Sequence, residues 1–392
     1  MIKRYASNLL LEKLKRFPIV TILGARQCGK TTFIKQLLPT WTYLDMEKPS
    51  DLAPFSQDPE SRIRQLKSKI IVDEAQRLPE IFPLLRSVVD EEKRNGRFVL
   101  LGSASPTLIQ HISESLAGRT AFLDMTPFRW NEVSEKRDDF SFDALWLRGG
   151  FPQPFLEKKS DPRADWYEAY TRTFIERDLA ALGIDIAAPQ MRKLWTMLAH
   201  LNGGIWNAST LAASLGVSYH TVNRYTDILE QTFLVRKLQP YFVNLGKRII
   251  KSPKIYFRDT GLLHYFLGIH DKTALNTHPA RGLSWESFLL EQIVTGFQMI
   301  TPRAQPTYYR TSGGIEIDLL IERGTHMVPF EIKLHSAPTR KDVPGLVKGM
   351  EDLKLKKGYV LYPGREDYSL GSGITVLSAE KILKNIKNLA AL

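Results

Sequence analysis

The sequence predicts a multidomain protein of the α/β class. Its 392 residues exceed what one ordinary hydrophobic core supports, so we expect two to four domains. Apolar runs of strand type occur at residues 19–23, 69–73 and 97–103, and the first precedes a helical pattern at residues 32–38. Continuous apolar runs are typical of parallel strands that are buried on both faces. We therefore expect a parallel sheet with helices in the first third of the chain.

The composition is that of an ordinary globular protein, with 43% hydrophobic and 24% charged residues. The sequence contains no run of eighteen apolar residues and no signal-peptide pattern, so we expect no membrane association. Cys28 is the only cysteine, which excludes an internal disulfide and is typical of a reducing compartment. These features together predict a cytoplasmic protein.

The most specific motif lies between the first apolar run and the helical pattern that follows it. Residues 24–31 read Gly-Ala-Arg-Gln-Cys-Gly-Lys-Thr and fit G-x-x-x-x-G-K-[ST] at every fixed position. Glycines let backbone N–H groups surround phosphate oxygens, and a helix N-terminus adds its positive dipole end. Lys30 would reach the outer phosphates, and the Thr31 hydroxyl would bind Mg²⁺. The motif predicts binding of a nucleoside triphosphate such as ATP by Gly24, Ala25, Arg26, Gln27, Cys28, Gly29, Lys30, Thr31 and Thr32.

Two adjacent carboxylates end the second apolar run. Asp73 would lie at the C-terminal end of a buried strand, where it can hold the Mg²⁺ of a bound nucleotide. Glu74 is placed to polarise an attacking water as a general base. Apolar strands that end in Asp are common, but the phosphate-binding motif upstream favours the functional interpretation. The two motifs together predict an ATPase.

Two further residues are weaker candidates for the ATPase site. Ser103 ends the third apolar run and could sense the γ-phosphate, although Ser and Gly also simply terminate strands. Arg119 follows a helical segment and could act as an arginine finger toward the nucleotide of a neighbouring subunit. The alternative for Arg119 is a basic residue that compensates a helix dipole. The finger interpretation predicts a homo-oligomer.

These motifs resemble those of prokaryotic AAA-family ATPases that carry a C-terminal domain of unknown function. The similar segments include residues 43–47, 71–76, 101–103, 115–119, 127–129, 148–152 and 174–178, and the resemblance covers nearly the whole chain. It implies a P-loop AAA-type ATPase core at residues 1–135, a helical lid or connector at 136–204, a winged helix-turn-helix at 205–262 and a PD-(D/E)XK nuclease-like domain at 263–392. One departure from the family pattern is the segment Phe128-Arg129-Trp130, where a smaller polar residue is expected in the middle.

Residues 208–231 have the pattern of a helix-turn-helix. A short helix, a turn at Gly216 and a second helix from Tyr219 are expected, with Val222 and Tyr225 on the core side of the second helix. His220, Asn223 and Arg224 lie on its polar side. Strand-like stretches at 233–238 and 254–257 would flank a wing. Winged helices also serve as lids or as protein–protein modules, so the pattern alone leaves the partner open.

Charge favours DNA as that partner. The net charge is +12, and residues 205–258 contain only two acidic residues. The same segment carries eight basic residues, Arg224, Arg236, Lys237, Lys247, Arg248, Lys251, Lys254 and Arg258. A local excess of this kind is an electrostatic footprint for nucleic acid. Lys247, Arg248 and Lys251 of the wing would contact phosphates, which position a protein without reading sequence.

A hairpin is predicted near the C-terminal end. Residues 315–322 and 327–334 have strand patterns, and residues 323–326 form the expected loop. In that register residue 322 pairs with 327, so Asp318 lies directly opposite Glu331. Opposed like charges are destabilising unless a cation lies between them, and Mg²⁺ prefers carboxylate oxygens. Lys333 would project from the same face and stabilise a phosphate or orient a water.

Asp318, Glu331 and Lys333 have the spacing of the PD-(D/E)XK nucleases. Glu286, in a helix with Trp285 and Phe288 turned inward, resembles the acidic residue that such folds add to the same metal site. The alternative is a surface hairpin with solvated charges, since a short E-x-K is abundant. A nuclease-like fold does not by itself imply cleavage.

The sequence thus favours an ATP-hydrolysing DNA-binding protein that directs a Mg²⁺-dependent endonuclease-like domain to DNA, with branched or damaged DNA as the expected substrate. One alternative is an ATP-driven signalling or regulatory switch whose C-terminal domains only bind partners. A second is a DNA translocase with an inactive nuclease fold, although the intact Asp318, Glu331 and Lys333 count against it.

Overall fold

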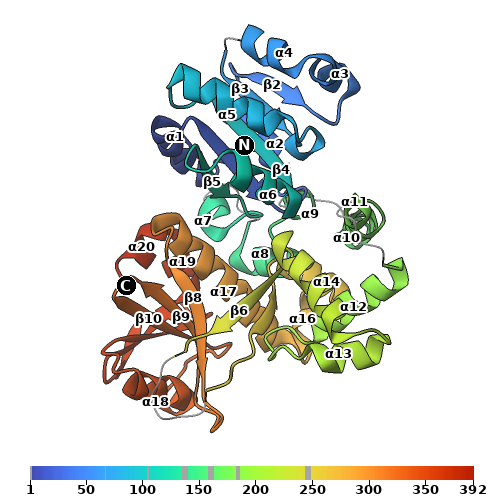
Figure 1. Cartoon of the computed structure of the whole chain (residues 1–392). Helices are drawn as coiled ribbons and strands as arrows, with labels where there is room; N and C mark the ends of the chain where they lie inside the picture. Colours follow the sequence, from blue (N-terminus) through green and yellow to red (C-terminus); the bar gives the residue numbers. More distant parts are fainter. Residues whose placement is uncertain are drawn as a thin grey trace. The chain divides into compact units, whose positions relative to one another are not determined.

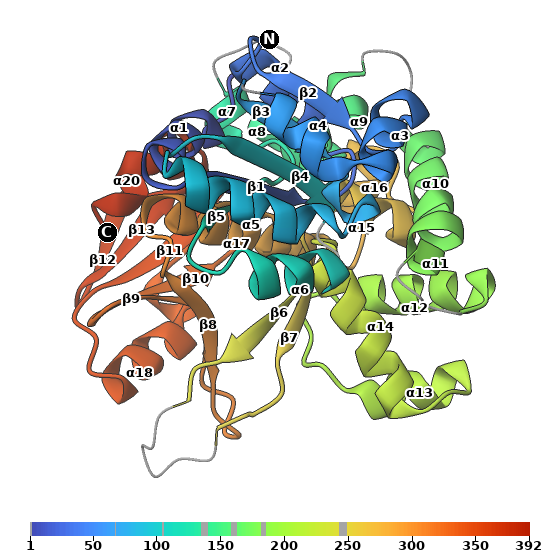
Figure 2. The ribbon, with the colours of Figure 1, turned by 45° about the horizontal axis from the view of Figure 1, so that its top comes forward.

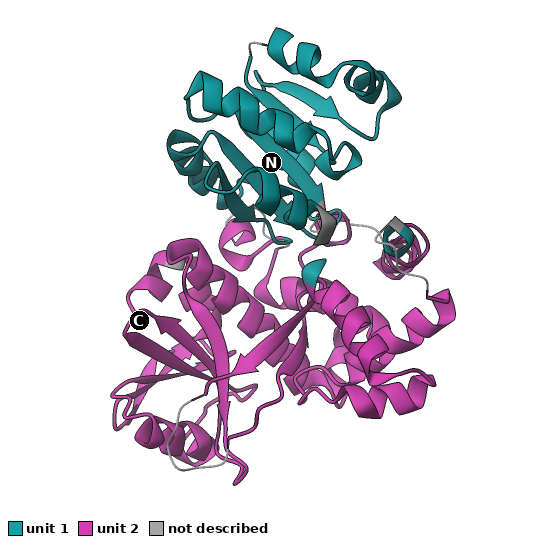
Figure 3. Ribbon diagram, in the orientation of Figure 1, with its two compact units in different colours: residues 1–127, 178–184, 231–233 teal, residues 128–177, 185–230, 234–392 magenta. Residues whose placement is uncertain are grey.

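The computed structural model in Figure 1 describes residues 2–66, 68–103, 106–134, 140–157, 163–181, 186–242 and 249–392. The chain forms two compact units, coloured separately in Figure 3. Unit 1 comprises Met1–Pro127, Asp178–Ile184 and Gln231–Phe233. Unit 2 comprises Phe128–Arg177, Asp185–Glu230 and Leu234–Leu392. A five-stranded sheet lies in unit 1 and an eight-stranded sheet in unit 2.

The sheet of unit 1 is parallel throughout and confirms the α/β prediction. Its strands are β1 (Ile19–Gly24), β2 (Thr42–Asp45), β3 (Ile70–Asp73), β4 (Phe98–Ser103) and β5 (Thr120–Asp124). They lie in the order β2-β3-β4-β1-β5, with all four neighbouring pairs parallel. The carboxyl ends of parallel strands meet at one edge, so the residues that follow β1, β3 and β4 are brought together there.

Helices cover this sheet. They are α1 (Ala6–Arg16), α2 (Lys30–Leu37), α3 (Pro49–Gln57), α4 (Pro59–Gln65), α5 (Ile81–Glu92) and α6 (Pro106–Ser115). Figure 2 shows α5 and α6 running across the sheet. Alternate strand residues such as Ile19, Leu23, Ile70 and Val72 pack with α3, α4, α5 and α6 in one buried cluster. The predicted strands and the helix after β1 are therefore confirmed.

The helices of unit 2 occur before, between and after its strands. They include α7 (Trp130–Val133), α8 (Phe142–Arg148), α9 (Pro152–Leu156), α10 (Arg163–Thr173), α12 (Ala188–His200), α13 (Ala208–Leu215), α14 (Tyr219–Gln231), α15 (Thr260–Leu267), α16 (Lys272–Thr277), α17 (Arg281–Ile300), α18 (Pro344–Asp352), α19 (Ala379–Lys384) and α20 (Ile386–Ala390). A π-helical turn at Phe174–Asp178 follows α10, and the short α11 (Leu179–Ala181) after it belongs to unit 1. In the described residues, no helix has the length and apolar character needed to cross a bilayer.

The sheet of unit 2 is mixed and has the order β12-β13-β11-β10-β9-β8-β6-β7. Its strands are β6 (Val235–Pro240), β7 (Lys254–Phe257), β8 (Gln305–Arg310), β9 (Glu316–Arg323), β10 (His326–Ile332), β11 (Gly358–Tyr362), β12 (Tyr368–Gly371) and β13 (Ile374–Ser378). Strand β6 pairs in parallel with β8. The segments 205–262 and 263–392, expected as separate domains, therefore share one sheet.

The hairpin of β9 and β10 has the predicted register. Met327 pairs with Glu322, and Phe330 pairs with Leu319, so the next opposed pair is Asp318 and Glu331. Arg323 and His326 were expected in the loop, but they form a further strand pair and leave a two-residue turn. A bulge on the other side of β9 adds one residue between its contacts with Thr307 and Tyr309 of β8. Bulges are frequent beside functional sites, where they re-aim a side chain.

The predicted helix pair is also present. Helix α13 ends at Gly216, whose left-handed φ of 68° suits glycine, and α14 begins at Tyr219. Val222, Tyr225, Ile228 and Leu229 are buried along α14, as the spacing predicts.

The segment at Phe128–Trp130, where the chain departs from the family pattern, attaches to α17 and α19. Arg129 donates through one guanidinium nitrogen to the Gln292 carbonyl at 2.8 Å. The backbone N–H of Trp130 donates to the Gln292 side chain at 3.0 Å, and its indole N–H donates to the Glu380 carbonyl at 3.1 Å. The large side chain of Trp130 is 3% exposed, so its role is packing.

Candidate functional site

The phosphate-binding loop follows β1, and its glycines have physical reasons to be glycine. A Cβ on Gly24 would lie 2.2 Å from the Met125 carbonyl oxygen, which is too close for any side chain. Gly29 has φ 97° at the N-cap of α2, in the left-handed region that glycine adopts at little cost. Gln27 also has a left-handed φ, of 58°. The loop therefore holds a strained backbone that is typical of phosphate-binding turns.

The side chain of Lys30 is folded into the base of this loop. Its Nζ donates to the carbonyl oxygens of Gly24 and Ala25, both at 2.9 Å. The residue is 8% exposed, so the ammonium is satisfied by backbone carbonyls. A phosphate oxygen entering the loop would offer Lys30 a charged acceptor in place of neutral ones, which is a stronger type of hydrogen bond.

Asp73 at the end of β3 accepts hydrogen bonds from three groups. Thr31 Oγ1 lies 2.7 Å and the Tyr43 hydroxyl 2.6 Å from Asp73 Oδ2. The backbone N–H of Glu74 donates to Oδ1 at 3.0 Å. The contact between Thr31 and Asp73 brings together the two side chains predicted to hold Mg²⁺. Tyr43 was not predicted as a site residue. The signal that could have found it is its position in β2, the strand beside β3, where Asp45 pairs in register with Asp73.

Glu74 occupies a left-handed backbone position, with φ 52°. Burial and the neighbouring Asp73 carboxylate raise the pKa of Glu74, while Lys30 and Arg26 oppose this shift. The Gln76 amide donates to its carboxylate. A raised pKa brings a carboxylate closer to the value that suits a general base near neutral pH. The geometry fits the role that the sequence predicts.

Arg26, within the loop, is bound by acidic residues of unit 1. It pairs with Asp178 and lies 3.8 Å from a Glu47 carboxylate oxygen. Glu47 in turn lies 3.2 Å from Arg77. Asp178 is the last residue of the π-helical turn that follows α10.

Two buried side chains, those of Arg4 and Cys28, contact the backbone in and around the phosphate-binding loop. Arg4, 7% exposed, donates to the Cys28 carbonyl at 3.2 Å. The Cys28 thiol is fully buried and lies 3.4 Å from the Met125 carbonyl oxygen. Only the backbone of Cys28 is therefore available to a phosphate, while Thr32 on α2 is exposed. Nothing in the local sequence around Arg4 indicated this role.

The two weaker ATPase candidates have different outcomes. Ser103 is the last residue of β4, and its backbone is in register with Gly24, but its side chain lies outside the described residues. Arg119 forms a two-point contact with Asp90, at 2.6 and 2.8 Å. A role as an arginine finger would require these bonds to break. This ion pair with Asp90 is a third interpretation of Arg119, in addition to the arginine finger and the compensation of a helix dipole.

The predicted carboxylate centre lies at the start of the β9–β10 hairpin. Asp318 and Glu331 are 8% and 6% exposed, and Asp318 Oδ2 accepts from the Ile332 backbone N–H at 2.8 Å. Glu331 Oε1 lies 2.8 Å from Lys333 Nζ. Glu331 Oε2 is buried and has no hydrogen-bond partner among the described residues. A buried carboxylate oxygen without a hydrogen-bond partner fits a site that could hold a cation, because burying such an atom unmatched is costly.

The electrostatics of this pair agree with that interpretation. Burial and the nearby Glu331 and Glu286 carboxylates raise the pKa of Asp318. Burial also raises the pKa of Glu331, which Lys333 partly offsets. Two close carboxylates in an apolar environment favour protonation unless a cation joins them.

Glu286 on α17 is bound to side chains of β7 and not to the Asp318–Glu331 pair. Its Oε1 accepts from the Tyr256 hydroxyl at 2.5 Å and lies 3.4 Å from Lys254 Nζ. Across the part of the chain that the structure describes, no three His, Cys, Asp or Glu side chains form a ready metal-binding group. The predicted three-carboxylate set is therefore not assembled, and the residues fit a site of two carboxylates, Asp318 and Glu331. Mg²⁺ is commonly bound through one or two carboxylates and water.

The predicted basic footprint at residues 205–258 is partly neutralised by internal ion pairs. Four of the eight basic side chains of this segment are mostly buried, and each forms an ion pair with an acidic residue of unit 2. Arg236 and Arg258 pair with Glu291, Lys237 pairs with Asp227, and Lys254 pairs with Glu286 and Glu316. Lys247 and Arg248 lie outside the described residues. Arg224 and Lys251 are exposed. The local excess of positive charge was thus a poor guide to surface charge.

The polar side of α14 is also partly engaged. His220 and Arg224 are exposed, as a DNA-reading helix requires. Asn223 Oδ1, however, accepts from the Trp206 indole N–H at 3.0 Å, so this amide is committed within the protein.

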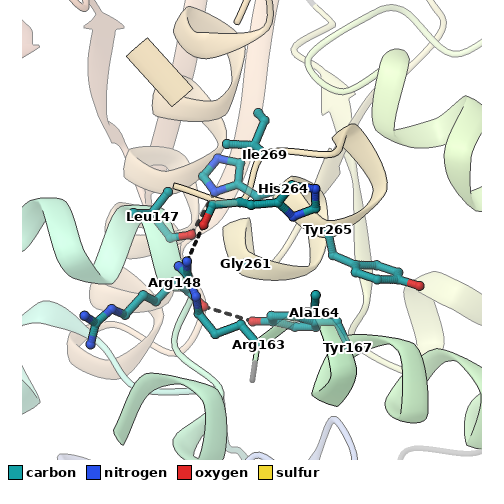
Figure 4. Close-up of a pocket in the computed structure, with 10 residues that line it drawn as sticks. Leu147, Arg148, Arg163, Ala164, Tyr167, Gly261, His264, Tyr265 and Ile269 are labelled. Atoms are coloured by element: carbon teal, nitrogen blue, oxygen red, sulfur yellow. Dashed lines mark hydrogen bonds between the residues drawn. The ribbon is translucent and has the colours of Figure 1, made fainter. Parts of the chain in front are cut away.

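Unit 2 also contains a pocket between α8, α10 and α15, shown in Figure 4. The Tyr167 hydroxyl lies 3.0 Å from the Arg148 carbonyl oxygen, and His264 Nδ1 lies 2.9 Å from the Leu147 carbonyl oxygen. The Arg148 side chain points away from the pocket in Figure 4. The polar groups at its wall bond to one another, so the pocket offers little for catalysis.

Family comparisons agree with the geometry of unit 1. A family model described as an AAA domain matches residues 16–134, which include β1, the phosphate-binding loop, Asp73 and Glu74. Models of two domains of unknown function, DUF8612 and DUF4143, match residues 139–273 and 281–382. The chain is therefore a P-loop ATPase with an AAA domain, and ATP is the nucleotide that this class implies.

The chain belongs to the family of two mycobacterial proteins. It is 41% identical over 385 residues to uncharacterized protein Rv2008c of Mycobacterium tuberculosis (strain ATCC 25618 / H37Rv) and to uncharacterized protein Mb2031c of Mycobacterium bovis (strain ATCC BAA-935 / AF2122/97). Each alignment covers 97% of this chain and 84% of the relative. Among solved structures, the Walker-type ATPase PABY2304 of Pyrococcus abyssi is similar, with a TM-score of 0.47 and 16% identity over 68% of this chain and 96% of that one.

Proposed function

We propose that this ATPase uses nucleotide hydrolysis to control a Mg²⁺-dependent centre in unit 2 that cleaves phosphodiester bonds in DNA. The observation that carries the proposal is the opposed pair Asp318 and Glu331 with Lys333 beside it. Glu331 Oε2 is buried without a partner among the described residues, and Lys333 Nζ lies 2.8 Å from Glu331 Oε1. Two carboxylates can hold a divalent metal, and a neighbouring lysine can stabilise charge on a phosphate.

In the ATPase site, each residue has a distinct role. Lys30 binds the outer phosphates, and Thr31 and Asp73 hold Mg²⁺, which neutralises phosphate charge when bound. Glu74 accepts the proton of the attacking water, for which its raised pKa suits it. The strained loop that contains Gln27 and Gly29 presents backbone N–H groups to the phosphates.

In unit 2, Asp318 and Glu331 hold Mg²⁺, which supplies Lewis-acid stabilisation of the phosphate when bound. Lys333 is 32% exposed, so its ammonium can turn from Glu331 toward a phosphate oxygen or a water. His220, Arg224 and Lys251 remain the described candidates for contacts with DNA. We infer a modest DNA contact surface, because the other described basic side chains of this segment have acidic partners.

A regulatory switch is the second candidate function. Internal pairing of Arg236, Lys237, Lys254 and Arg258 favours it, because these charges are unavailable to DNA phosphates. In that case the helix pair of unit 2 would bind a protein partner in a nucleotide-dependent way. Stimulation of ATP hydrolysis by DNA would favour the first function, and its absence, with nucleotide-dependent binding of a protein, would favour the second.

The test incubates the full-length protein with supercoiled and branched DNA and Mg²⁺ or Mn²⁺, with and without ATP. We expect the wild type to cleave DNA and Asp318→Asn to lose cleavage while it keeps ATP hydrolysis. Lys30→Ala should lose hydrolysis and any effect of ATP on cleavage. Cleavage that persists in Asp318→Asn, or a wild type that cleaves none of these substrates, would refute the nuclease function.

A further inference from the structure

The buried amine of Lys254 lies at the carboxylate centre, although this residue belongs to β7 and was expected to contribute to DNA binding. Its side chain is 4% exposed, and Nζ lies 2.5 Å from Glu316 Oε1 and 3.4 Å from Glu286 Oε1. Glu286 is the third carboxylate that the sequence assigned to the metal. Lys254 therefore contacts a predicted metal ligand from β7, the strand at one edge of the sheet.

The charges around this centre are already nearly balanced. Four carboxylates, those of Glu286, Glu316, Asp318 and Glu331, interact with three cationic side chains. The cationic side chains are Lys254, Lys333 and Arg310, the last of which lies 3.1 Å from Glu316. A divalent cation added to this cluster is attracted by the four carboxylates and repelled by the three cationic side chains, so each of these cations weakens metal binding.

Glu286 is the carboxylate that can change partners. It is fixed by Tyr256 at 2.5 Å and by Lys254 at 3.4 Å, whereas the bond from Lys254 to Glu316 is shorter, at 2.5 Å. If Glu286 turned to a metal, Lys254 would keep Glu316 as its counter-ion. The main cost of breaking a buried ion pair is the unpaired charge that it leaves behind. Here neither Lys254 nor Glu286 would be left unpaired.

We propose that Lys254 is a built-in counter-cation that competes with the divalent metal for Glu286. This inference rests on the metal centre of the proposed function. It assigns Lys254 as a positioning residue that sets metal affinity and not as a group that touches DNA. In the metal-free protein, Lys254 and Tyr256 hold Glu286 aside; metal binding takes Glu286 from them and completes the three-carboxylate set.

The test measures Mn²⁺ binding to the nucleotide-free, full-length protein by calorimetry and by the electron paramagnetic resonance of free Mn²⁺. Asp318→Asn identifies the signal that belongs to this centre. Lys254→Met, which removes the charge and keeps the length, should bind Mn²⁺ about tenfold more tightly, because a like charge beside the site is gone. Lys254→Arg keeps the charge and should stay within about twofold of the wild type.

Tyr256→Phe provides an independent variant in case Lys254→Met does not fold, which circular dichroism would reveal. Tyr256→Phe removes the hydrogen bond to Glu286 without removing a charge. We therefore expect the dissociation constant for Mn²⁺ to fall by a few-fold. Equal or weaker binding by a folded Lys254→Met, or by Tyr256→Phe if the first does not fold, would overturn the competition. Absence of any Mn²⁺ signal sensitive to Asp318→Asn would instead refute the metal centre itself, so the two failures are distinguishable.

Discussion

Asp73 and Glu74 illustrate how single residues prepare the ATPase site. Asp73 is held by the hydroxyls of Thr31 and Tyr43 and by the Glu74 backbone, so its carboxylate is oriented before nucleotide binds. Glu74 is turned by a left-handed backbone into a partly buried position that raises its pKa. The two neighbouring carboxylates thus differ: that of Asp73 is held in place by three donors, and that of Glu74 is made more basic.

The role of Glu74 as general base predicts the effect of replacing it. Glu74→Gln should lower the turnover of ATP by about a hundredfold or more, because proton transfer to a positioned base contributes at least that much. Nucleotide affinity should change little, since Glu74 is assigned to the water and not to the phosphates. Steady-state hydrolysis and equilibrium binding of a fluorescent ATP analogue check both parts. The exposed Glu80→Gln is the matched control, and turnover of Glu74→Gln within twofold of the wild type would exclude this base.

His264 is a residue whose surroundings fix its protonation state. A carbonyl can only accept, so Nδ1 carries the proton toward Leu147 at 2.9 Å, and Nε2 accepts from the Ser284 hydroxyl at 2.6 Å. The Trp146 indole N–H donates to the same Ser284 oxygen at 3.0 Å. Burial lowers the pKa of His264 to about 4, and the charges of Arg163 and His278 add to this effect.

The shift predicts acid sensitivity. In the unfolded chain this histidine binds a proton near pH 6.5, but in the folded protein only near pH 4. The unfolded state therefore binds more protons in that window, and the free energy of unfolding falls as pH falls through it. The loss attributable to His264 amounts to about 3 kcal/mol.

Denaturant unfolding at several pH values checks this prediction. His264→Gln should show a smaller loss of stability between pH 6.5 and 4 than the wild type, whereas the exposed His220→Gln should follow the wild type. Parallel pH curves for the wild type and His264→Gln would contradict the assignment.

At the scale of elements, a buried ion triad joins helix α17 to the β6–β7 strand pair. Glu291 of α17 accepts from Arg236 Nε at 2.9 Å and from Arg258 Nε at 2.8 Å. Burial alone would raise the pKa of Glu291, but the two guanidinium groups hold it below its ordinary value. The strand pair is therefore fixed to the same helix that carries Glu286.

Breaking this triad should be costly. Glu291→Ala leaves two buried guanidinium groups without their shared partner, and we expect the free energy of unfolding to fall by about 3–5 kcal/mol. The exposed Glu351→Ala on α18 should change stability by less than about 0.5 kcal/mol. Urea unfolding of both variants provides the measurement. A loss below about 1 kcal/mol for Glu291→Ala would mean that the triad contributes little.

At the scale of the whole molecule, the chain has two units, each with its own sheet and core. The nucleotide site belongs to unit 1, and the carboxylate centre belongs to unit 2. A ligand that binds one folded unit stabilises that unit by mass action. ATP should therefore act first on the stability of unit 1.

Scanning calorimetry tests this expectation. We expect two transitions, and ATP with Mg²⁺ at about one hundred times its dissociation constant should stabilise one of them by about 2.7 kcal/mol. Lys30→Ala should abolish that shift while it leaves the other transition unchanged. A single transition that ATP shifts as a whole would show that the two units unfold together.

Much of this architecture could be predicted because its signals are local. The loop at Gly24–Thr31 follows from glycine geometry, and the register of Asp318 against Glu331 follows from strand alternation and turn length. The sequence determined the helix pair and the parallel strands for the same reason, since periodicity and turn residues act within a few positions. The hairpin loop was two residues shorter than expected, because Arg323 and His326 still pair across it.

Tertiary structure alone decided which charges remain available. Lys254, Arg236 and Arg258 contribute to a basic segment in the sequence, but each finds a carboxylate on a distant element once the chain folds. Tyr43 joins Asp73 only because β2 lies beside β3, and Glu286 is held by Tyr256 and Lys254 only because α17 packs near β7. Ion pairing and burial depend on neighbours far apart in the chain, so they are properties of the fold and not of the local sequence.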